Sequence, residues 1–415
     1  MGPILVFDKS TLQSLSVDEA VWLHKFYSAN ITPLFFVETL ADLEKRVKKG
    51  RTPEEIVGTL ALKTAPMGAR PNVHHLELCR AELLGGNVAM TGQIVVSDRS
   101  AVVTANGSGV LFRPSPEEEA LQRWQEGEFL TVERHFARSW RNTLAELDLG
   151  KWKASSEAYP RPRTLAEARD IAVRIISHDG SRYRLLQAAL TVFDVPTYSR
   201  QDVLRRWKSE GGPRISEFAP YVDYVLTVDT FFGLALHSGL ISAERASNRL
   251  DIAYLYYLPF CMVFTSNDNL HERTVPLFLR EDQRFVRGVD LKADLAKLDA
   301  HYSALPEEIL RQGVMRFAPY PPTEGEFLTS AIWDQLMSPT WREDSVAPEP
   351  SKEIQDALLK LVNSMSEEAS DALGKIDVMK AGGVVVESRV PLRMGKWKLF
   401  PPEVEEKASR KGSAK

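Results

Sequence analysis

Four acidic residues stand where a carboxylate is costly to bury and where it could do chemistry. Asp8 closes the apolar run PILVF, Glu38 ends PLFFV, Asp251 opens DIAYLYYLPF and Asp268 follows CMVFTSN. Carboxylates at the carboxyl ends of buried strands face the crevice where open α/β sheets bind ligands. Four of them would repel one another unless divalent cations held them together. The pattern therefore predicts a metal-dependent active site.

The apolar runs predict the elements that position these acids. Residues 3–7 and 33–37 are continuous apolar runs, as in buried parallel strands, and residues 39–49 fit a helix after the second one. Ser16 and Glu19 fit a capping box that opens a helix. Three later apolar segments are predicted as a buried helix, a second helix and a strand: residues 221–240, 251–258 and 261–265.

The middle and the end of the chain follow other patterns. Residues 92–112 predict a hairpin with Asn-Gly turn chemistry. Ser115 is placed to cap a helical region that begins at Pro116 and extends to about residue 149. Polar or proline-rich stretches predict linkers, and the spacing of apolar residues predicts four helices and one strand. The linkers are 151–163 and 342–352, the helices 164–189, 199–208, 290–302 and 353–373, and the strand 382–390.

The acids, taken in order with their neighbours, resemble the motifs of the PIN-domain family of metal-dependent nucleases. Asp8 with Ser10 two residues later matches the first motif, and Glu38 matches the second. Asp251 matches the third, and Thr265 with Asp268 the fourth, where Asn267 could replace the last acid. The resemblance covers roughly residues 3–60 and 215–285. It implies Mg²⁺ or Mn²⁺ as cofactor, with Asp8, Glu38, Asp251 and Asp268 as metal-binding and catalytic residues. Ser10, Thr265 and Asn267 would support them.

The spacing of the motifs departs from a compact PIN domain, because 212 residues separate Glu38 from Asp251. We therefore expect an α/β fold: a PIN-like, Rossmann-like parallel sheet flanked by helices, with a large, mainly helical insertion and an α+β C-terminal extension. The expected divisions are a discontinuous nuclease core, an insertion with a hairpin and helices, a helical extension, and a C-terminal α/β extension with a basic tail. Their bounds are 1–60 with 215–290, then 61–214, 291–340 and 353–415.

Each of these residues also has a structural interpretation without catalysis. Asp8 and Asp251 could cap the helices they precede, and Asp268 could form a turn. Glu38 could be favoured by the dipole at a helix start. Thr265, Ser266 and Asn267 could orient a metal-bound water or only satisfy a turn, and His271 could contact a phosphate or be a partly exposed helix residue. The ordered set favours function.

A basic and aromatic stretch in the middle of the chain is a candidate nucleic-acid surface. Arg134, Arg138 and Arg141 lie near Trp124 and Trp140, and arginine binds phosphate while aromatic rings stack on unpaired bases. Several glutamates interrupt the stretch, so a helix with mixed charge and a buried tryptophan side explains it as well.

Composition sets limits on these proposals. The chain of 415 residues is 44% hydrophobic and 26% charged, as in an ordinary soluble protein, and its formal net charge of −4 provides no overall basic field for nucleic acid. There are only two cysteines, Cys79 and Cys261, and neither is part of a CxxC pair, which argues against a disulfide scaffold or a structural zinc site. Neither a signal peptide nor a membrane-spanning run is apparent, so we expect a cytoplasmic protein with no membrane partner.

The predicted function is hydrolysis of phosphodiester bonds by a PIN-like ribonuclease, possibly an endonuclease. RNA is the expected substrate because of the resemblance, although the residues themselves do not separate RNA from DNA. The competing class is a non-catalytic scaffold that binds nucleic acid or protein on a degenerate PIN-like fold. A phosphatase that uses Asp8 as nucleophile would usually carry a second Asp where Ser10 stands. The sequence leaves open homo-oligomers and protein partners.

Overall fold

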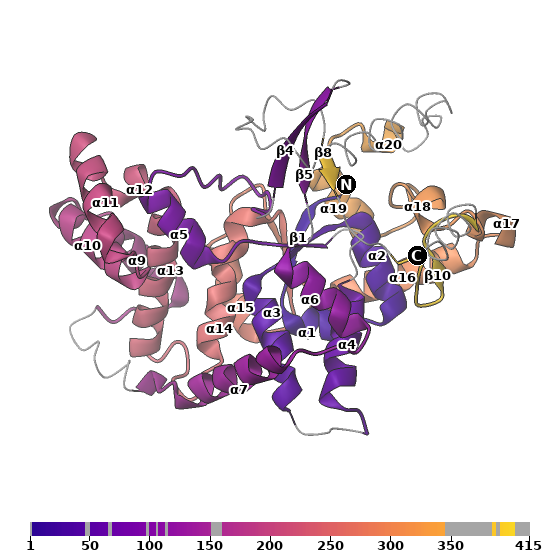
Figure 1. The fold of residues 1–415 in the computed structure, drawn as a ribbon, viewed down its shortest axis with the longest axis horizontal. Coiled ribbons are helices and arrows are strands. Elements are labelled where there is room, and N and C mark those ends of the chain that lie inside the picture. The colour runs from indigo at the N-terminus through magenta and orange to yellow at the C-terminus, as the bar shows by residue number, and fades with distance from the viewer. Residues whose placement is uncertain are drawn as a thin grey trace.

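The computed structural model describes residues 2–45, 50–64, 69–96, 99–104, 107–112, 115–150, 160–344, 384–386 and 391–402. A five-stranded parallel sheet runs through its centre (Figure 1). Its strands stand in the order β3-β2-β1-β6-β7. Its strands are β1 (Ile4–Phe7), β2 (Ser28–Ile31), β3 (Ala69–Pro71), β6 (Val263–Ser266) and β7 (Arg284–Arg287). The molecule is therefore an α/β protein, and this order is compatible with a Rossmann-like sheet.

The sheet reverses its direction of winding between β1 and β6. From β1 the chain proceeds to β2 and β3 on one side, and then returns to place β6 and β7 on the other side of β1. Phe7 and Thr265 are in register across the β1–β6 pair, so the segments after these two strands leave the sheet side by side. In open α/β sheets, this reversal point is where ligands bind beyond the carboxyl ends of the strands.

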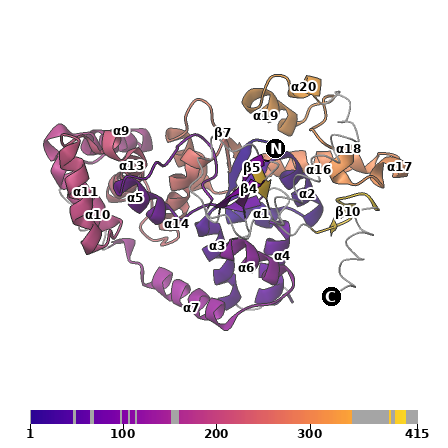
Figure 2. The same ribbon diagram turned by 45° about the horizontal axis from the view of Figure 1, so that its top comes forward.

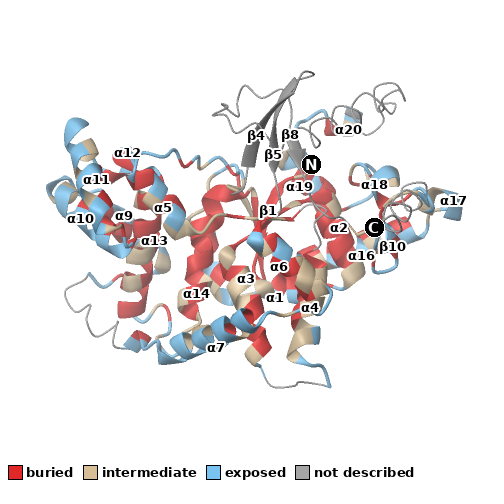
Figure 3. Ribbon diagram, in the orientation of Figure 1, coloured by how far each residue is buried: buried red, intermediate tan, exposed pale blue. Residues whose placement is uncertain are grey.

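The two faces of the sheet bury two separate apolar clusters, because side chains alternate along a strand. Ile4 and Val6 of β1 belong to one cluster, whereas Leu5 and Phe7 belong to the other. Figure 3 shows the buried residues following the sheet and the helices directly against it. The central strand, buried on both sides, explains why residues 3–7 read as one continuous apolar run.

Helices from the middle of the chain cover the face of Ile4 and Val6. They are α5 (His75–Leu83), α9 (Leu165–Ile176), α10 (Arg182–Val192), α11 (Thr197–Ser209), α12 (Ile215–Phe218), α13 (Pro220–His237) and α14 (Asn248–Ala253), with the 3-10 helices η2 (Asp179–Ser181) and η3 (Tyr254–Phe260). Helix α13 packs against α9 and α5, and the buried carboxylate of Glu82 accepts hydrogen bonds from the first amides of α13, those of Tyr221 and Val222. In Figure 2, α9, α10, α11 and α13 are grouped to one side of the sheet.

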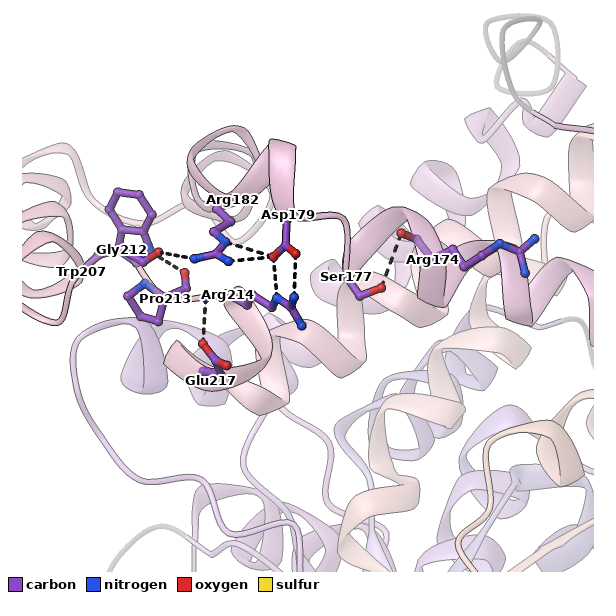
Figure 4. A network of polar contacts seen from close by, with 9 residues as sticks. All are labelled: Arg174, Ser177, Asp179, Arg182, Trp207, Gly212, Pro213, Arg214 and Glu217. Carbon is purple, nitrogen blue, oxygen red and sulfur yellow. Dashed lines mark hydrogen bonds and ion pairs between the residues drawn. The ribbon is translucent and has the colours of Figure 1, made fainter.

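A network of charged side chains closes the outer end of this helical group (Figure 4). Asp179 accepts hydrogen bonds from Arg182, and from Nε and an Nη of Arg214 at 2.6 Å each. The two guanidinium groups hold the pKa of the Asp179 carboxyl below its usual value. The network joins the turn before α10 to the start of α12. It is exposed to solvent, so salt screens it.

The other face, that of Leu5 and Phe7, is covered by helices from two parts of the chain, residues 9–146 and residues 288–336. They are α1 (Lys9–Ser14), α2 (Val17–Phe26), α3 (Pro33–Leu40), α4 (Pro53–Lys63), α6 (Pro116–Gln125), α7 (Thr131–Glu146), α16 (Gly288–Ser303) and α19 (Leu328–Leu336), with η1 (Ala41–Glu44). Helix α2 packs on α16, α4 packs on α6, and α7 packs on α3 and η1.

The remaining described elements are short strands outside the central sheet and several short helices. Strands β4 (Arg99–Thr104) and β5 (Gly107–Phe112) form a hairpin to which β8 (Val384–Val386) adds in parallel, and β9 (Arg393–Met394) pairs with β10 (Trp397–Lys398). The other short helices are α15 (Asn269–Thr274), η4 (Val275–Leu277), α17 (Glu307–Leu310), α18 (Val314–Phe317) and α20 (Trp341–Asp344). Within the described residues, none of the helices combines the length and apolar character that a membrane crossing needs.

Several local predictions are confirmed. Ser16 and Glu19 form the predicted capping box, and the Ser115 side chain accepts from the Glu118 amide at the start of α6. A hairpin is present, formed by β4 and β5 within residues 99–112, and residues 92–96 are not a strand; Asn106 of the predicted turn lies outside the described residues. The predicted long helix from residue 116 is two helices, α6 and α7. The strand predicted near residues 382–390 is β8, and the helix predicted over 353–373 lies outside the described residues.

The prediction of a strand at residues 33–37 is wrong. Residues 33–40 form helix α3, whose N-cap is Thr32 with Pro33 in the first turn, and the second strand is the preceding segment, β2. Thr followed by Pro is a helix start signal, and five apolar residues are too few to separate a helix from a strand by periodicity. The helix predicted over residues 39–49 is, in its described part, the end of α3 followed by η1.

The central sheet also includes a strand from the segment that was predicted to be an insertion. Strand β3, at residues 69–71, lies within the range 61–214 and pairs with β2 as the edge strand of the central sheet.

Candidate functional site: an acidic cluster beyond β1 and β6

Asp8 follows β1 directly and caps helix α1. One carboxylate oxygen, Oδ1, accepts from the Thr11 amide at 2.9 Å. The other oxygen, Oδ2, accepts from the hydroxyls of Ser10 at 2.6 Å and Ser266 at 2.8 Å. The side chain is buried, and these three donors fix its orientation. Capping uses only Oδ1, so it leaves Oδ2 available for the functional role predicted for Asp8.

Asp268 follows β6, the strand next to β1, and caps helix α15. Its Oδ1 accepts from the Leu270 amide at 2.6 Å, and its own backbone N–H donates to Oγ of Ser266 at 2.9 Å. Asp8 and Asp268 therefore leave the sheet on the two sides of its reversal point and share Ser266 as a neighbour.

Glu38 reaches the same region from helix α3. It lies in the second half of this helix, where the dipole does not favour a negative charge, so its position needs another explanation. Oε2 accepts a hydrogen bond from the hydroxyl of Tyr254 at 2.6 Å. Burial raises the pKa of the Glu38 carboxyl, with smaller contributions from Asp8 and Asp42 and an opposing one from Tyr254 and Lys9.

Asp251 lies in helix α14, and its pKa responds to the charges of the other three acids. Its pKa is raised to about 8, first by burial and then by the negative charges of Asp268, Glu38 and Asp8, with Arg245 opposing them. Repulsion of this kind acts over short distances in a protein. The four predicted acids, from β1, α3, α14 and the end of β6, are thus brought together in one cluster.

A hydrogen-bonded line of side chains connects the two halves of this cluster. Oγ of Ser266 lies 2.8 Å from Nδ1 of His271, and Nε2 of the same ring lies 2.6 Å from the backbone carbonyl of Asp251. The His271 ring is fully buried and makes edge-to-face contacts with the rings of Phe264 and Tyr254. Burial lowers the pKa of His271, against smaller opposing contributions from Asp8, the Asp251 carbonyl and Asp268.

The other predicted site residues take different positions. Thr265 is fully buried, and its Oγ1 has no hydrogen-bond partner within the described part of the chain. Asn267 is exposed. Arg134 and Arg138 lie on α7 and pair with Glu54 at 2.8 Å and Glu44 at 3.5 Å, so their charges are partly neutralised. Arg141 lies on the same helix, which packs on α3, the helix of Glu38.

Two residues of the cluster were missed by sequence reasoning. Lys9 donates to the backbone carbonyl of Glu38 at 2.9 Å and pairs with the buried Asp42 at 2.6 Å, although burial lowers its pKa. Tyr254 holds Glu38. Local signals for both existed, since Lys9 follows Asp8 and Tyr254 stands three residues after Asp251, which places it on the same helical face.

The donor set suits a hard divalent cation in its chemistry, since Mg²⁺ and Mn²⁺ prefer carboxylate oxygens. The arrangement itself is not a ready-made cage: among the described residues, no three His, Cys, Asp or Glu side chains are placed to hold one ion. A cation would have to draw carboxylates away from their present hydrogen bonds. A cavity of about 750 Å³ lies elsewhere, between α17 and the β9–β10 hairpin, lined by Leu310, Arg311, Trp397 and neighbouring residues.

Comparison with protein-family models, with curated proteins and with solved structures found no match to the chain.

Proposed function

We propose that the protein is a PIN-like, metal-dependent nuclease that hydrolyses phosphodiester bonds, with RNA as its substrate. The observation that supports this most is the cluster of Asp8, Glu38, Asp251 and Asp268 beyond the reversal point of a parallel sheet. Four acids from separate elements repel one another there, and a folded protein keeps such an arrangement at a cost in stability. Binding of divalent cations would offset that cost, and the bound cations would serve the hydrolysis.

The chain's own residues supply position and charge in this reaction. Asp8 and Asp268 are held by helix-capping bonds, and Glu38 is held by Tyr254, so these carboxylates are presented from rigid elements. Asp8, Glu38, Asp251 and Asp268 would hold Mg²⁺ or Mn²⁺, which when bound lowers the pKa of water and stabilises the leaving oxygen. Lys9, next to Asp8, adds a positive charge at the border of the cluster.

The preference for RNA rests on the resemblance to PIN domains. DNA is the alternative substrate, and it is tested in parallel. The arginines of α7 are the proposed contact to the phosphate backbone. Arg134 and Arg138 pair with glutamates in the free protein, so nucleic acid would have to displace these pairs. Exposed pairs of this kind are weak, which makes the exchange feasible.

The test is cleavage of labelled single-stranded RNA and DNA by the purified chain with Mn²⁺ or with EDTA. We expect RNA cleavage that requires Mn²⁺ and is lost in Asp8→Asn, which keeps the size of the side chain. Asp290→Asn, an exposed acid in the first turn of α16, is the matched control and should cleave as the wild type does. Full activity of Asp8→Asn at saturating Mn²⁺ would refute the assignment.

One observation favours a second function, that of a non-catalytic scaffold on a degenerate PIN-like fold. Among the described residues, no three His, Cys, Asp or Glu side chains are arranged to hold one ion. Such an arrangement is expected of a site that no longer binds a metal. The two functions differ in their response to Mn²⁺. An intact site gains thermal stability on binding the ion, whereas a scaffold that binds nucleic acid or protein without metal does not.

A further inference from the structure

Three segments that follow neighbouring strands of the sheet meet at the start of helix α16. Thr11 lies on α1 after β1, Asn267 follows β6, and Gly288 is the first residue of α16, directly after β7. The strands β1, β6 and β7 are neighbours, and the last residues of β6 and β7, Ser266 and Arg287, are in register. The chain therefore gathers polar groups from three strand ends at one point.

Gly288 stands where another side chain would collide with two polar atoms. A Cβ atom at this position would lie 2.7 Å from the hydroxyl oxygen of Thr11 and 2.7 Å from the side-chain oxygen of Asn267. Gly288 is not one of the glycines with positive φ, so its backbone conformation does not call for glycine. Close approach of polar groups to the first peptide unit of α16 accounts for it instead.

The Thr11 hydroxyl points at this helix start and has nothing to bond there. Thr11 is 1% exposed, and among the residues that the structure describes its Oγ1 has no hydrogen-bond partner. Its backbone amide is already used, because it donates to Oδ1 of Asp8. A buried hydroxyl without a partner is costly in a folded protein, and it calls for a group that completes it.

Helix α16 supplies further donors at the same point. It is 16 residues long, and no side chain of the described residues caps its first amides, which have no partner within the helix. The start of such a helix carries a partial positive charge and favours phosphate groups. Arg287, directly before the helix, adds a full positive charge. Its exposed pair with Glu272, at 3.7 Å, is too weak to hold it.

We propose that the start of α16 binds a phosphodiester group of single-stranded nucleic acid. The donors are the amides of Gly288 and Val289, the Thr11 hydroxyl and the Arg287 guanidinium. Asn267 is exposed, so its side chain can turn away from Gly288 and direct its amide nitrogen to the phosphate. Carboxylates of the acidic cluster lie at the same end of the sheet and favour a singly charged phosphodiester over a doubly charged terminal phosphate.

This site deepens the proposed function and rests on it for the kind of ligand. Thr11 is three residues after Asp8 and bonded to it, so a phosphate held at α16 keeps the nucleic-acid backbone beside the acidic cluster. The donors are amides, a hydroxyl and a guanidinium. Binding at α16 therefore requires no metal ion, and it can be measured without one.

Thr11→Val separates a role in binding from a role in folding. The hydroxyl has no partner in the free protein, so its removal should leave the free energy of unfolding unchanged or increased, while binding is weakened. Thr39→Val is the matched control, because the Thr39 hydroxyl on α3 is also buried and without a partner among the described residues. Gly288→Ala tests the site from its other side, since the added methyl group displaces the polar atoms around it.

The measurement is the fluorescence anisotropy of a fluorescein-labelled oligouridylate of about ten nucleotides, in EDTA at low salt. We expect binding about 10-fold weaker in Thr11→Val, Gly288→Ala and Arg287→Gln, the size of a lost hydrogen bond to a charged group, and wild-type binding in Thr39→Val. Arg284→Gln, at the other end of β7, controls for net charge and should stay within about 2-fold of the wild type.

Three results would overturn the site: no binding by the wild type, wild-type binding in Thr11→Val, or equal losses in Arg287→Gln and Arg284→Gln. A marked loss of stability in Thr11→Val, measured in urea, would show that the hydroxyl has a structural partner and would also overturn it. The nuclease assignment fails separately. Binding that depends on Thr11 in a protein that cleaves nothing with Mn²⁺ refutes the catalysis and keeps the site, whereas cleavage with undiminished binding in Thr11→Val refutes the site alone.

Discussion

Replacing Asp251 with Asn should stabilise the metal-free protein at alkaline pH. Asp251 is an acid whose pKa in the folded protein, about 8, lies above its ordinary value of 3.8. The folded state therefore retains its proton where the unfolded state has lost it. The sign follows: stability is highest below pH 4 with respect to this group, and it is lost as the pH rises from about 4 to about 8.

The size of the effect follows from the same two values. The full difference between 3.8 and about 8 corresponds to at most about 6 kcal/mol. The side chain is only partly buried, and water and neighbouring side chains can relax around its charge, so we expect about 2–3 kcal/mol between pH 5 and pH 8.5. Asn keeps the shape and a polar side chain but carries no charge at either pH.

Urea denaturation in EDTA at pH 5 and pH 8.5 measures this directly. The free energy of unfolding of Asp251→Asn, relative to the wild type, should be larger at pH 8.5 by that amount. Asp290→Asn serves as control, because Asp290 is exposed to solvent and its replacement should have the same effect at both pH values. An equal difference at both pH values would show that the four acids do not interact as described.

Two further substitutions test the partners of the cluster. Tyr254→Phe should cost about 1–2 kcal/mol in urea denaturation, because it removes a hydrogen bond to the buried Glu38 carboxyl; a cost near zero would contradict that contact. In the wild type, the hydrogen bond from Tyr254 lowers the pKa of Glu38, so its loss should raise that pKa. The same change should therefore weaken Mn²⁺ binding more at pH 6 than at pH 8. Lys9→Met should cost about 1–3 kcal/mol by leaving buried Asp42 without one of its two lysines, and Asp42→Asn in the same protein should restore most of it. Additive losses in the double variant would show that the two residues act separately.

Local rules were enough to place Asp8 and Asp268. Each follows a short buried strand, and a carboxylate there also caps the next helix, so the signal lies within a few residues. The position of Glu38 was predicted through the wrong element. Helix α3 follows β2 directly, so its side chains reach the same end of the sheet that a strand ending at Val37 would have reached.

The links within the cluster depend on tertiary packing and have no local signal. His271 meets a carbonyl 20 residues earlier because α15 packs against α14, and Ser266 meets Asp8 because β6 pairs with β1. Strand β3 is three residues long and includes Pro71, so its place in the sheet is decided by its pairing with β2 and not by propensity. In the same way, His271 was expected to be partly exposed, because its burial is set by Phe264 and Tyr254 and not by its own helix.

The claim on which the proposed function depends is that four acids from separate elements form one cation site. Titration calorimetry with Mn²⁺ tests it most directly, on the wild type beside Asp251→Asn and Asp290→Asn at pH 8. We predict saturable binding to the wild type and to Asp290→Asn, and binding weakened at least about 10-fold in Asp251→Asn. Equal binding by all three proteins, or no saturable binding to the wild type, would contradict the claim.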